Sequence, residues 1–171
     1  MAAVSAPLLC DRGLTLTEVA VVMILGSLIT AGLVGFYLSS QGVWLDASTQ
    51  AITQREASLV ATAIRDSVRQ SAKAWVSPSP DAEHMQLALY RTPNDATPYY
   101  YFYWNATDSL IHAGPTHGGP GAGPIGSSRA TRLQFDSSSF PEGGGAVRVD
   151  LRLLSASGGR VDMGAYAVFK N

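Results

Sequence analysis

One carboxylate, that of Glu18, stands directly before twenty residues (19–38) that include no charged residue and no proline. At about 1.5 Å per helical residue this apolar run reaches roughly 30 Å, the thickness of a bilayer's hydrocarbon core. A carboxylate inside or beside a membrane is costly, and such residues are usually functional and paired. The run itself supplies no cation. The chemistry expected of Glu18 is therefore an ion pair with a group from elsewhere.

The residues that precede the run carry a family resemblance. Arg12 and Gly13 stand before a Leu-Thr-Leu-Thr segment that leads to Glu18. This pattern resembles the class III signal of type IV pilins and type II secretion pseudopilins. In that family a prepilin peptidase cuts after the glycine on the cytoplasmic face of the membrane and methylates the new N-terminus. The resemblance implies cleavage between Gly13 and Leu14 with N-methylation at Leu14, although the family more commonly has phenylalanine there. It also implies that Glu18 is the family's acidic residue for assembly.

Cleavage after Gly13 would give Glu18 the cation that the run lacks. The new α-ammonium at Leu14 lies at the same end of the helix, and a neighbouring chain shifted along the axis can bring its amine opposite the carboxylate. Two such charges attract strongly in a low dielectric, and each alone carries a large desolvation cost. Glu18 is therefore interpreted as a device that sets the register of stacked helices. The alternative is that Glu18 only caps the helix start, where the helix dipole favours a carboxylate.

The resemblance and the apolar pattern together divide the chain into four segments. They are a cleaved leader (1–13), a transmembrane and assembly helix (14–40), an amphipathic helix that continues it (41–76), and a β-rich globular domain (77–171). The resemblance implies a single crossing of the bacterial inner membrane, with the N-terminus in the cytoplasm and the C-terminal domain in the periplasm. The implied partners are the prepilin peptidase, the membrane, and other pilins or pseudopilins that join through the N-terminal helix in a pilus or pseudopilus.

The helix that carries Glu18 is expected to extend far beyond the apolar run. Apolar residues recur at helical spacings of three, four or seven, at positions 45, 52, 59 or 60, 64, 68, 72 and 75. Charged residues fall mostly between them, so one face is expected to pack against a globular domain. The Ser-Pro-Ser-Pro-Asp segment at residues 77–81 ends this helical pattern.

Beyond residue 80 the period changes to that of strands. Alternating, aromatic or β-branched runs predict strands at 85–91, 99–104, 109–113, 131–135, 146–154 and 160–169. A Ser-Ala-Ser-Gly-Gly turn is expected to pair the last two strands. The predicted fold class is therefore α+β, with a long N-terminal helix packed on a C-terminal antiparallel sheet. The order of elements is similar to that of J-type minor pseudopilins and PilW-like minor pilins.

Other candidate sites carry weaker patterns. His112 and His117 lie at or within a Gly- and Pro-rich loop (113–128), but no third ligand at a suitable spacing accompanies them, so no metal is expected. The Asn-Ala-Thr sequence at Asn105 matches a short glycosylation motif. The aromatic run at residues 99–104 is interpreted as a core strand, with partner contact on one face as the alternative.

Composition excludes several classes of function. The net charge is −1 and the twelve Lys and Arg residues are scattered, so nucleic-acid binding lacks a basic patch. Cys10 is the only cysteine, so the chain cannot form an internal disulfide. Glycine-flanked serine, HExxH, P-loop and paired-acid motifs are absent from the sequence, so neither an enzyme nor a cofactor is expected.

Two functions from different classes remain open. The first is a minor pilin or minor pseudopilin, with the type IV pilus and type II secretion both possible. The second is a signal-anchored, single-pass extracytoplasmic binding domain in which Gly13 and Glu18 occur by chance. Only the first requires removal of residues 1–13, so N-terminal sequencing separates the two.

Overall fold

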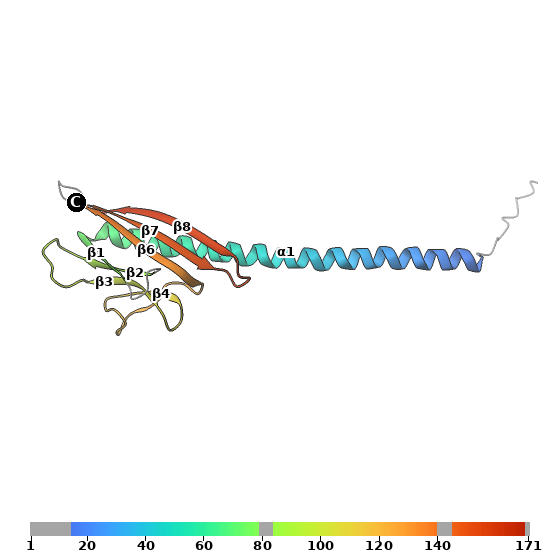
Figure 1. Ribbon diagram of the computed structural model, residues 1–171, viewed down its shortest axis with the longest axis horizontal. Helices are drawn as coiled ribbons and strands as arrows, with labels where there is room; N and C mark the ends of the chain where they lie inside the picture. The colour runs from blue at the N-terminus through green and yellow to red at the C-terminus, as the bar shows by residue number, and fades with distance from the viewer. Residues whose placement is uncertain (1–14, 79–83, 140–144, 170–171) are drawn as a thin grey trace, which may run out of the picture. The chain divides into compact units, whose positions relative to one another are not determined.

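The computed structural model describes residues 15–78, 84–139 and 145–169. The chain divides into two compact units, Met1–Trp44 and Leu45–Asn171, and helix α1 (Leu16–Gln70) runs through the boundary (Figure 1). Within the described residues of the first unit, α1 is the only regular element. The second unit holds the C-terminal part of α1 and all of the described strands.

The strands form two antiparallel sheets, one with the order β1-β2-β3-β4-β5 and one with the order β6-β7-β8. The first contains β1 (Lys73–Pro78), β2 (Met85–Tyr90), β3 (Tyr100–Asn105), β4 (Leu110–Gly114) and β5 (Gly123–Pro124). The second contains β6 (Arg129–Ser139), β7 (Gly145–Leu154) and β8 (Arg160–Val168). A parallel bridge between His84 and Leu133 connects the start of β2 to β6.

The predicted α+β class is confirmed in its coarse form, as one long apolar N-terminal helix with antiparallel strands. The expectation of one sheet is wrong, because the strands divide into two sheets between β5 and β6. The Gly- and Pro-rich segment adds only the two residues of β5 to the first sheet. The Ile125 N–H still donates to the Ile111 carbonyl at 2.9 Å, and beyond it the chain leaves the first sheet and begins the second at Arg129.

The predicted amphipathic helix at 41–76 is too long, because α1 ends at Gln70. The Ser71 N–H and the Ser71 hydroxyl both donate to the Val68 carbonyl, at 3.1 and 2.7 Å, and close the last turn. Residues 73–78 form β1, in which Ala74 and Val76 pack against the core while Trp75 is exposed. That alternation is the period of a strand, which the helical interpretation of Trp75 overlooked.

The predicted apolar face of the helix is only partly correct. The buried residues of α1 are Thr53, Ala57, Val60, Ala61, Ile64 and Val68. Leu45, Ile52 and Leu59 are more than half exposed, at 56%, 60% and 58%. Because seven residues make nearly two full helical turns, these three form their own exposed stripe, which is separate from the buried face.

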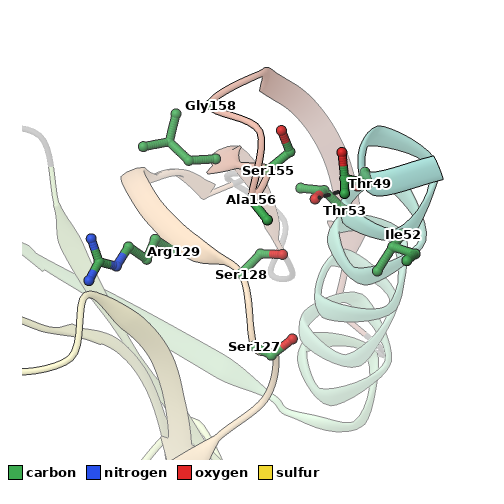
Figure 2. A pocket seen from close by; sticks show the side chains of 10 residues that line it. Thr49, Ile52, Thr53, Ser127, Ser128, Arg129, Ser155, Ala156 and Gly158 are labelled. Atoms are coloured by element: carbon green, nitrogen blue, oxygen red, sulfur yellow. Dashed lines mark hydrogen bonds between the residues drawn. The ribbon is translucent and has the colours of Figure 1, made fainter. Parts of the chain in front are cut away.

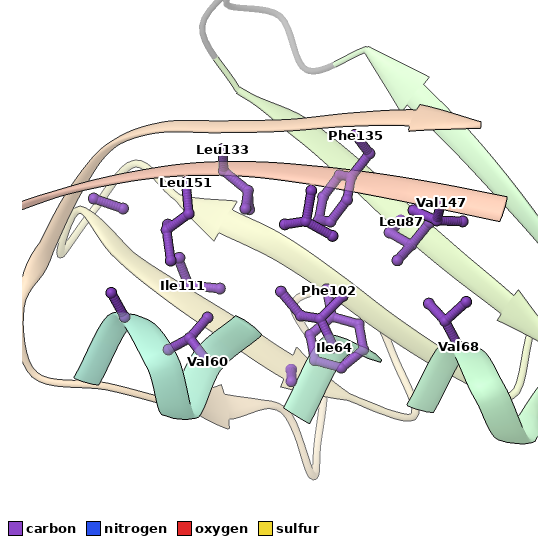
Figure 3. Close-up of a cluster of buried hydrophobic side chains, with 14 of the residues drawn as sticks. Val60, Ile64, Val68, Leu87, Phe102, Ile111, Leu133, Phe135, Val147 and Leu151 are labelled. Atoms are coloured by element: carbon purple, nitrogen blue, oxygen red, sulfur yellow. The ribbon is translucent and has the colours of Figure 1, made fainter. Parts of the chain in front are cut away.

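The core of the second unit combines side chains from α1 and from both sheets (Figure 3). The helix contributes Val60, Ile64 and Val68, the five-stranded sheet Leu87, Phe102 and Ile111, and the three-stranded sheet Leu133, Phe135, Val147 and Leu151. Full burial of one such side chain stabilises the fold by about 1.5–3 kcal/mol. This shared core holds the two sheets and the end of α1 together.

The predicted hairpin of the last two strands is confirmed. β7 and β8 pair antiparallel from Ala146 opposite Val168 to Leu154 opposite Arg160. The apolar residues of β7 are buried in strict alternation with half-buried or exposed ones. The hairpin therefore presents one face to the core and a polar face outward.

Candidate functional site

The start of α1 is built around a reciprocal contact between Thr15 and Glu18. The Thr15 N–H and hydroxyl both donate to Glu18 Oε2, at 2.8 and 2.9 Å, and the Glu18 N–H donates to Thr15 Oγ1 at 3.3 Å. Since α1 begins at Leu16, Thr15 is the N-cap and Glu18 the third helical residue of a capping box. A cap was one of the two roles predicted for Glu18, and the structure adds Thr15 as its partner. The Thr-x-x-Glu spacing was the signal that could have found it.

This geometry supports the alternative role of Glu18 without excluding the first. The cap uses one carboxylate oxygen, Oε2, for both bonds from Thr15. Oε1 keeps its acceptor capacity, which an ammonium from a neighbouring chain can use. Gly13 and Leu14, the proposed cleavage pair, lie outside the described residues. The ion pair between Glu18 and a Leu14 amine therefore stays a prediction.

The helix surface of the first unit is predominantly apolar in its described residues. Large apolar side chains of this unit are exposed throughout, from Leu16 at 87% to Trp44 at 70%. The hydroxyls of Ser27 and Thr30 donate to the helix carbonyls of Ile24 and Gly26, both at 2.8 Å. These intrahelical bonds satisfy polar groups that would be costly in a lipid environment.

By length and composition α1 can span a membrane. Its most apolar 18-residue window has a mean hydropathy of 2.4, and it lies near the N-terminus. Tyr37 and Trp44 are exposed towards the end of the uncharged stretch, where aromatic side chains are typical of a membrane–water interface. A single-pass membrane protein is consistent with these features.

In the second unit, Glu56 of α1 binds the segment directly before β6. Its Oε1 accepts a short hydrogen bond from the Ser127 hydroxyl, and its Oε2 accepts one from the Ser128 N–H at 2.9 Å. Burial acts to raise the pKa of Glu56, but the hydrogen bonds from Ser127 and Ser128 outweigh it and lower the pKa below the ordinary 4.5. This contact could not be predicted from the sequence, because Glu56 and Ser127 are 71 residues apart and no motif links them.

The lowered pKa of Glu56 predicts a contribution to stability that depends on pH. Because the folded-state pKa lies below the unfolded value, the contribution is complete above the ordinary pKa and disappears as the pH falls through the folded-state value. Glu56→Gln is expected to lower the free energy of unfolding by about 1 kcal/mol at neutral pH and by less in acid. Urea unfolding of the full chain in detergent at pH 7 and pH 3 measures the difference. Asp46→Asn, an exposed change on the same helix, is the control; an equal effect of Glu56→Gln at both pH values would contradict the argument.

A hollow of about 480 Å³ lies beside this contact, between α1, the segment before β6 and the β7–β8 turn (Figure 2). Hydroxyl and small apolar side chains line it, and the Arg129 guanidinium points away from α1 (Figure 2). The lining side chains are Thr49, Ile52, Thr53, Ser127, Ser128, Leu154, Ser155 and Ala156, together with Arg129 and Gly158. None of these residues can act as a general base, so this hollow offers no nucleophile–base pair.

The Gly- and Pro-rich loop lies over the outer face of the aromatic strand β3. The Gly118 N–H donates to the Tyr103 hydroxyl at 3.1 Å, and the His117 ring lies 4.2 Å from that of Tyr103. Phe102, on the opposite face of β3, lies in the core. The loop of the same chain therefore covers much of the face that the sequence left open for a partner, and Tyr103 is buried.

His112 and Asp108 form a local pair at the β3–β4 turn. His112 Nε2 lies 2.7 Å from Asp108 Oδ2. The Leu110 N–H donates to Asp108, and this bond together with His112 lowers the pKa of the carboxyl. Within the described ranges, no group of three or more His, Cys, Asp or Glu side chains is placed to hold a metal.

Asn105, in the glycosylation motif, accepts the Thr107 N–H at 3.0 Å in a turn.

Comparisons with protein-family models, with curated proteins and with solved structures give no match to this chain.

Proposed function

We propose that this chain is a minor pilin or minor pseudopilin, a structural subunit of a type IV pilus or of a type II secretion pseudopilus. The observation that carries the proposal is the placing of Gly13 just before, and of Glu18 in the first turn of, an apolar helix whose side chains are exposed. An apolar surface of this kind needs a lipid or protein environment. Its role would be to assemble with related subunits, not to turn over a substrate.

The proposed mechanism has three steps. The chain inserts in the bacterial inner membrane with its N-terminus in the cytoplasm and its second unit outside. Prepilin peptidase removes residues 1–13 and methylates Leu14. The helix then leaves the bilayer and stacks against those of other subunits, with Glu18 facing a neighbour's α-ammonium.

A second candidate is a signal-anchored extracytoplasmic binding domain. The observation that favours it is the capping box, because the bonds from Thr15 to Glu18 account for the carboxylate without a partner subunit. In this case the helix is an uncleaved anchor and the second unit carries the function alone.

Processing distinguishes the two candidates. Intact-mass measurement of the membrane-purified chain is expected to show the loss of thirteen residues and the gain of one methyl group in cells that have prepilin peptidase. A Gly13→Leu variant is the matched control and should keep its full length, since a bulky residue then occupies the cleavage position. A wild-type chain that retains Met1 to Gly13 in the presence of the active peptidase would overturn the pilin proposal.

A further inference from the structure

The three-stranded sheet of the second unit has a free edge at β8. Within the described residues β8 pairs only with β7, whereas β6 is bridged to the other sheet through His84 and Leu133. We propose that two copies of this chain associate through β8, antiparallel and about a two-fold axis, so that the two three-stranded sheets become one of six strands. This inference does not rest on the proposed function, since it concerns only the second unit.

The hydrogen-bond pattern shows which groups of β8 remain available. The Phe169 N–H donates to Gly145 O at 3.0 Å, so odd-numbered residues of this strand face β7. In an antiparallel pair the intervening residues direct their N–H and C=O groups to the other side. Gly164, Tyr166 and Val168 thus present a row of backbone donors and acceptors along the edge. A second β-strand is the ligand that satisfies such a row.

The edge carries little of the protection that natural edge strands usually have. Within β8 the charged residues are Arg160 and Asp162; residues 163–169 contain no charge and no proline, and Lys170 follows them in the sequence. Tyr166 and Val168 are 66% and 59% exposed. Large exposed side chains beside free backbone groups are typical of a surface that another chain covers.

The same edge offers a projecting side chain and a hollow two residues apart. Tyr166 projects from the outer face of β8, and a hollow of about 350 Å³ lies at Gly164. Arg148, Asp150 and Asp162 are among the residues that line this hollow. The Arg148 guanidinium already lies 5.7 Å from the ring of Tyr166 in the same chain. Arg148 also pairs with Asp150 at 3.0 Å and lies 3.4 Å from the Tyr166 hydroxyl of its own chain, so a partner's tyrosine would join an existing guanidinium–carboxylate pair, which its ring and hydroxyl can contact.

A two-fold axis through Ala165 would bring the Tyr166 side chain of each copy to the hollow at Gly164 of the other copy. Antiparallel pairing about this axis places Tyr166 of one copy opposite Gly164 of its partner, and the reverse, as hydrogen-bonded pairs. An aromatic residue opposite an edge glycine covers the surface beside the missing side chain, where Asp150 Oδ1 lies 3.3 Å from the position that a Cβ of Gly164 would take. Because the contact occurs twice, one self-complementary surface accounts for both halves of the interface. A second copy of this chain is thus the occupant that the edge fits.

Cysteine cross-linking of the full chain tests this pairing. Ala165 faces its own copy across the axis as a non-hydrogen-bonded pair, with Cα atoms about 4.5 Å apart, which is within disulfide range. In detergent micelles, Ala165→Cys with Cys10→Ser is expected to form a disulfide-linked dimer on mild oxidation. Ala156→Cys, in the exposed β7–β8 turn, is the matched control and should cross-link much less. Addition of Glu18→Val should leave the Ala165→Cys dimer unchanged, which separates this contact from assembly through the helix.

Tyr166→Lys supplies the second arm of the test. This variant replaces the Tyr166 ring by a positive charge at both symmetric sites. It is expected to lower the association constant of the dimer about tenfold or more. Sedimentation of the chain without engineered cysteines measures this constant. Ser157→Lys, which adds the same charge in the exposed turn, should have little effect. A cross-link at Ala165→Cys no stronger than at Ala156→Cys, or association that Tyr166→Lys leaves unchanged, would overturn the proposal.

Discussion

Glu18→Val is expected to abolish association with partner subunits while membrane insertion is retained. Valine makes the apolar helix more apolar, so insertion should be equal or improved. What is lost is the proposed pairing with a neighbour's Leu14 amine, which leaves that cation unpaired. Removal of one partner of a buried ion pair costs about 3–5 kcal/mol, which shifts an association constant by two or more decades. Co-purification of the variant with partner pilins, beside the wild-type chain, measures the effect.

Glu18→Gln separates the charge of Glu18 from its capping bonds. A glutamine at this position can still accept the Thr15 N–H, because capping boxes use Glu or Gln. If the charge sets the register, Glu18→Gln should fail to associate as Glu18→Val does. If the carboxylate serves only the cap, Glu18→Gln should associate like the wild type, and the register hypothesis then fails. The intact mass of each variant checks that processing at Gly13 persists.

Phe102→Ala is expected to lower the free energy of unfolding of the second unit by about 3–5 kcal/mol, the usual cost of an aromatic deletion in a core. Phe102 is 1% exposed and packs in the shared core of α1 and both sheets. Its ring also lies edge-on to that of Tyr100, with centroids 5.4 Å apart. Urea unfolding of the full chain in detergent, followed by near-ultraviolet circular dichroism, measures the loss.

Trp75→Ala is the matched control for the core deletion. Trp75 is the larger aromatic side chain but is 60% exposed on β1. Its removal should change the free energy of unfolding by less than about 1 kcal/mol, because little apolar surface returns to water. Equal losses for Trp75→Ala and Phe102→Ala would contradict the assignment of the core.

Local patterns in the sequence predicted the elements whose periods are unambiguous. The alternation of β7 is visible in the sequence because Val147, Val149 and Leu151 are each followed by a charged residue, and a Gly-Gly turn leads to β8. β1 was missed because Trp75 also continues the helical spacing from Val68, and a short apolar segment fits either period. The division into two sheets depends on which distant strands pair, and no local pattern at Pro124 or Arg129 contains that information.

The candidate sites divide in the same way. The capping box of Thr15 and Glu18 is a four-residue pattern, so it could be predicted from the sequence alone. The bond between Glu56 and Ser127 joins residues that only the folded chain brings together. Likewise, the burial of Tyr103 depends on how the Gly- and Pro-rich loop folds back over β3. A high content of glycine and proline predicts only that the loop is irregular.

The free edge of β8 also matters for the preparation of this protein. Residues 163–169 are seven successive uncharged residues, and Tyr166, Val168 and Phe169 among them favour strands; low charge and strand-forming residues are features of segments from which ordered aggregates grow. The charges that flank this segment in the sequence are Arg160 and Asp162 before it and Lys170 directly after it. At high concentration the surface that suits one second copy can also recruit misfolded chains without limit. A lysine at Tyr166 would therefore act as a gatekeeper and improve the solubility of the purified chain.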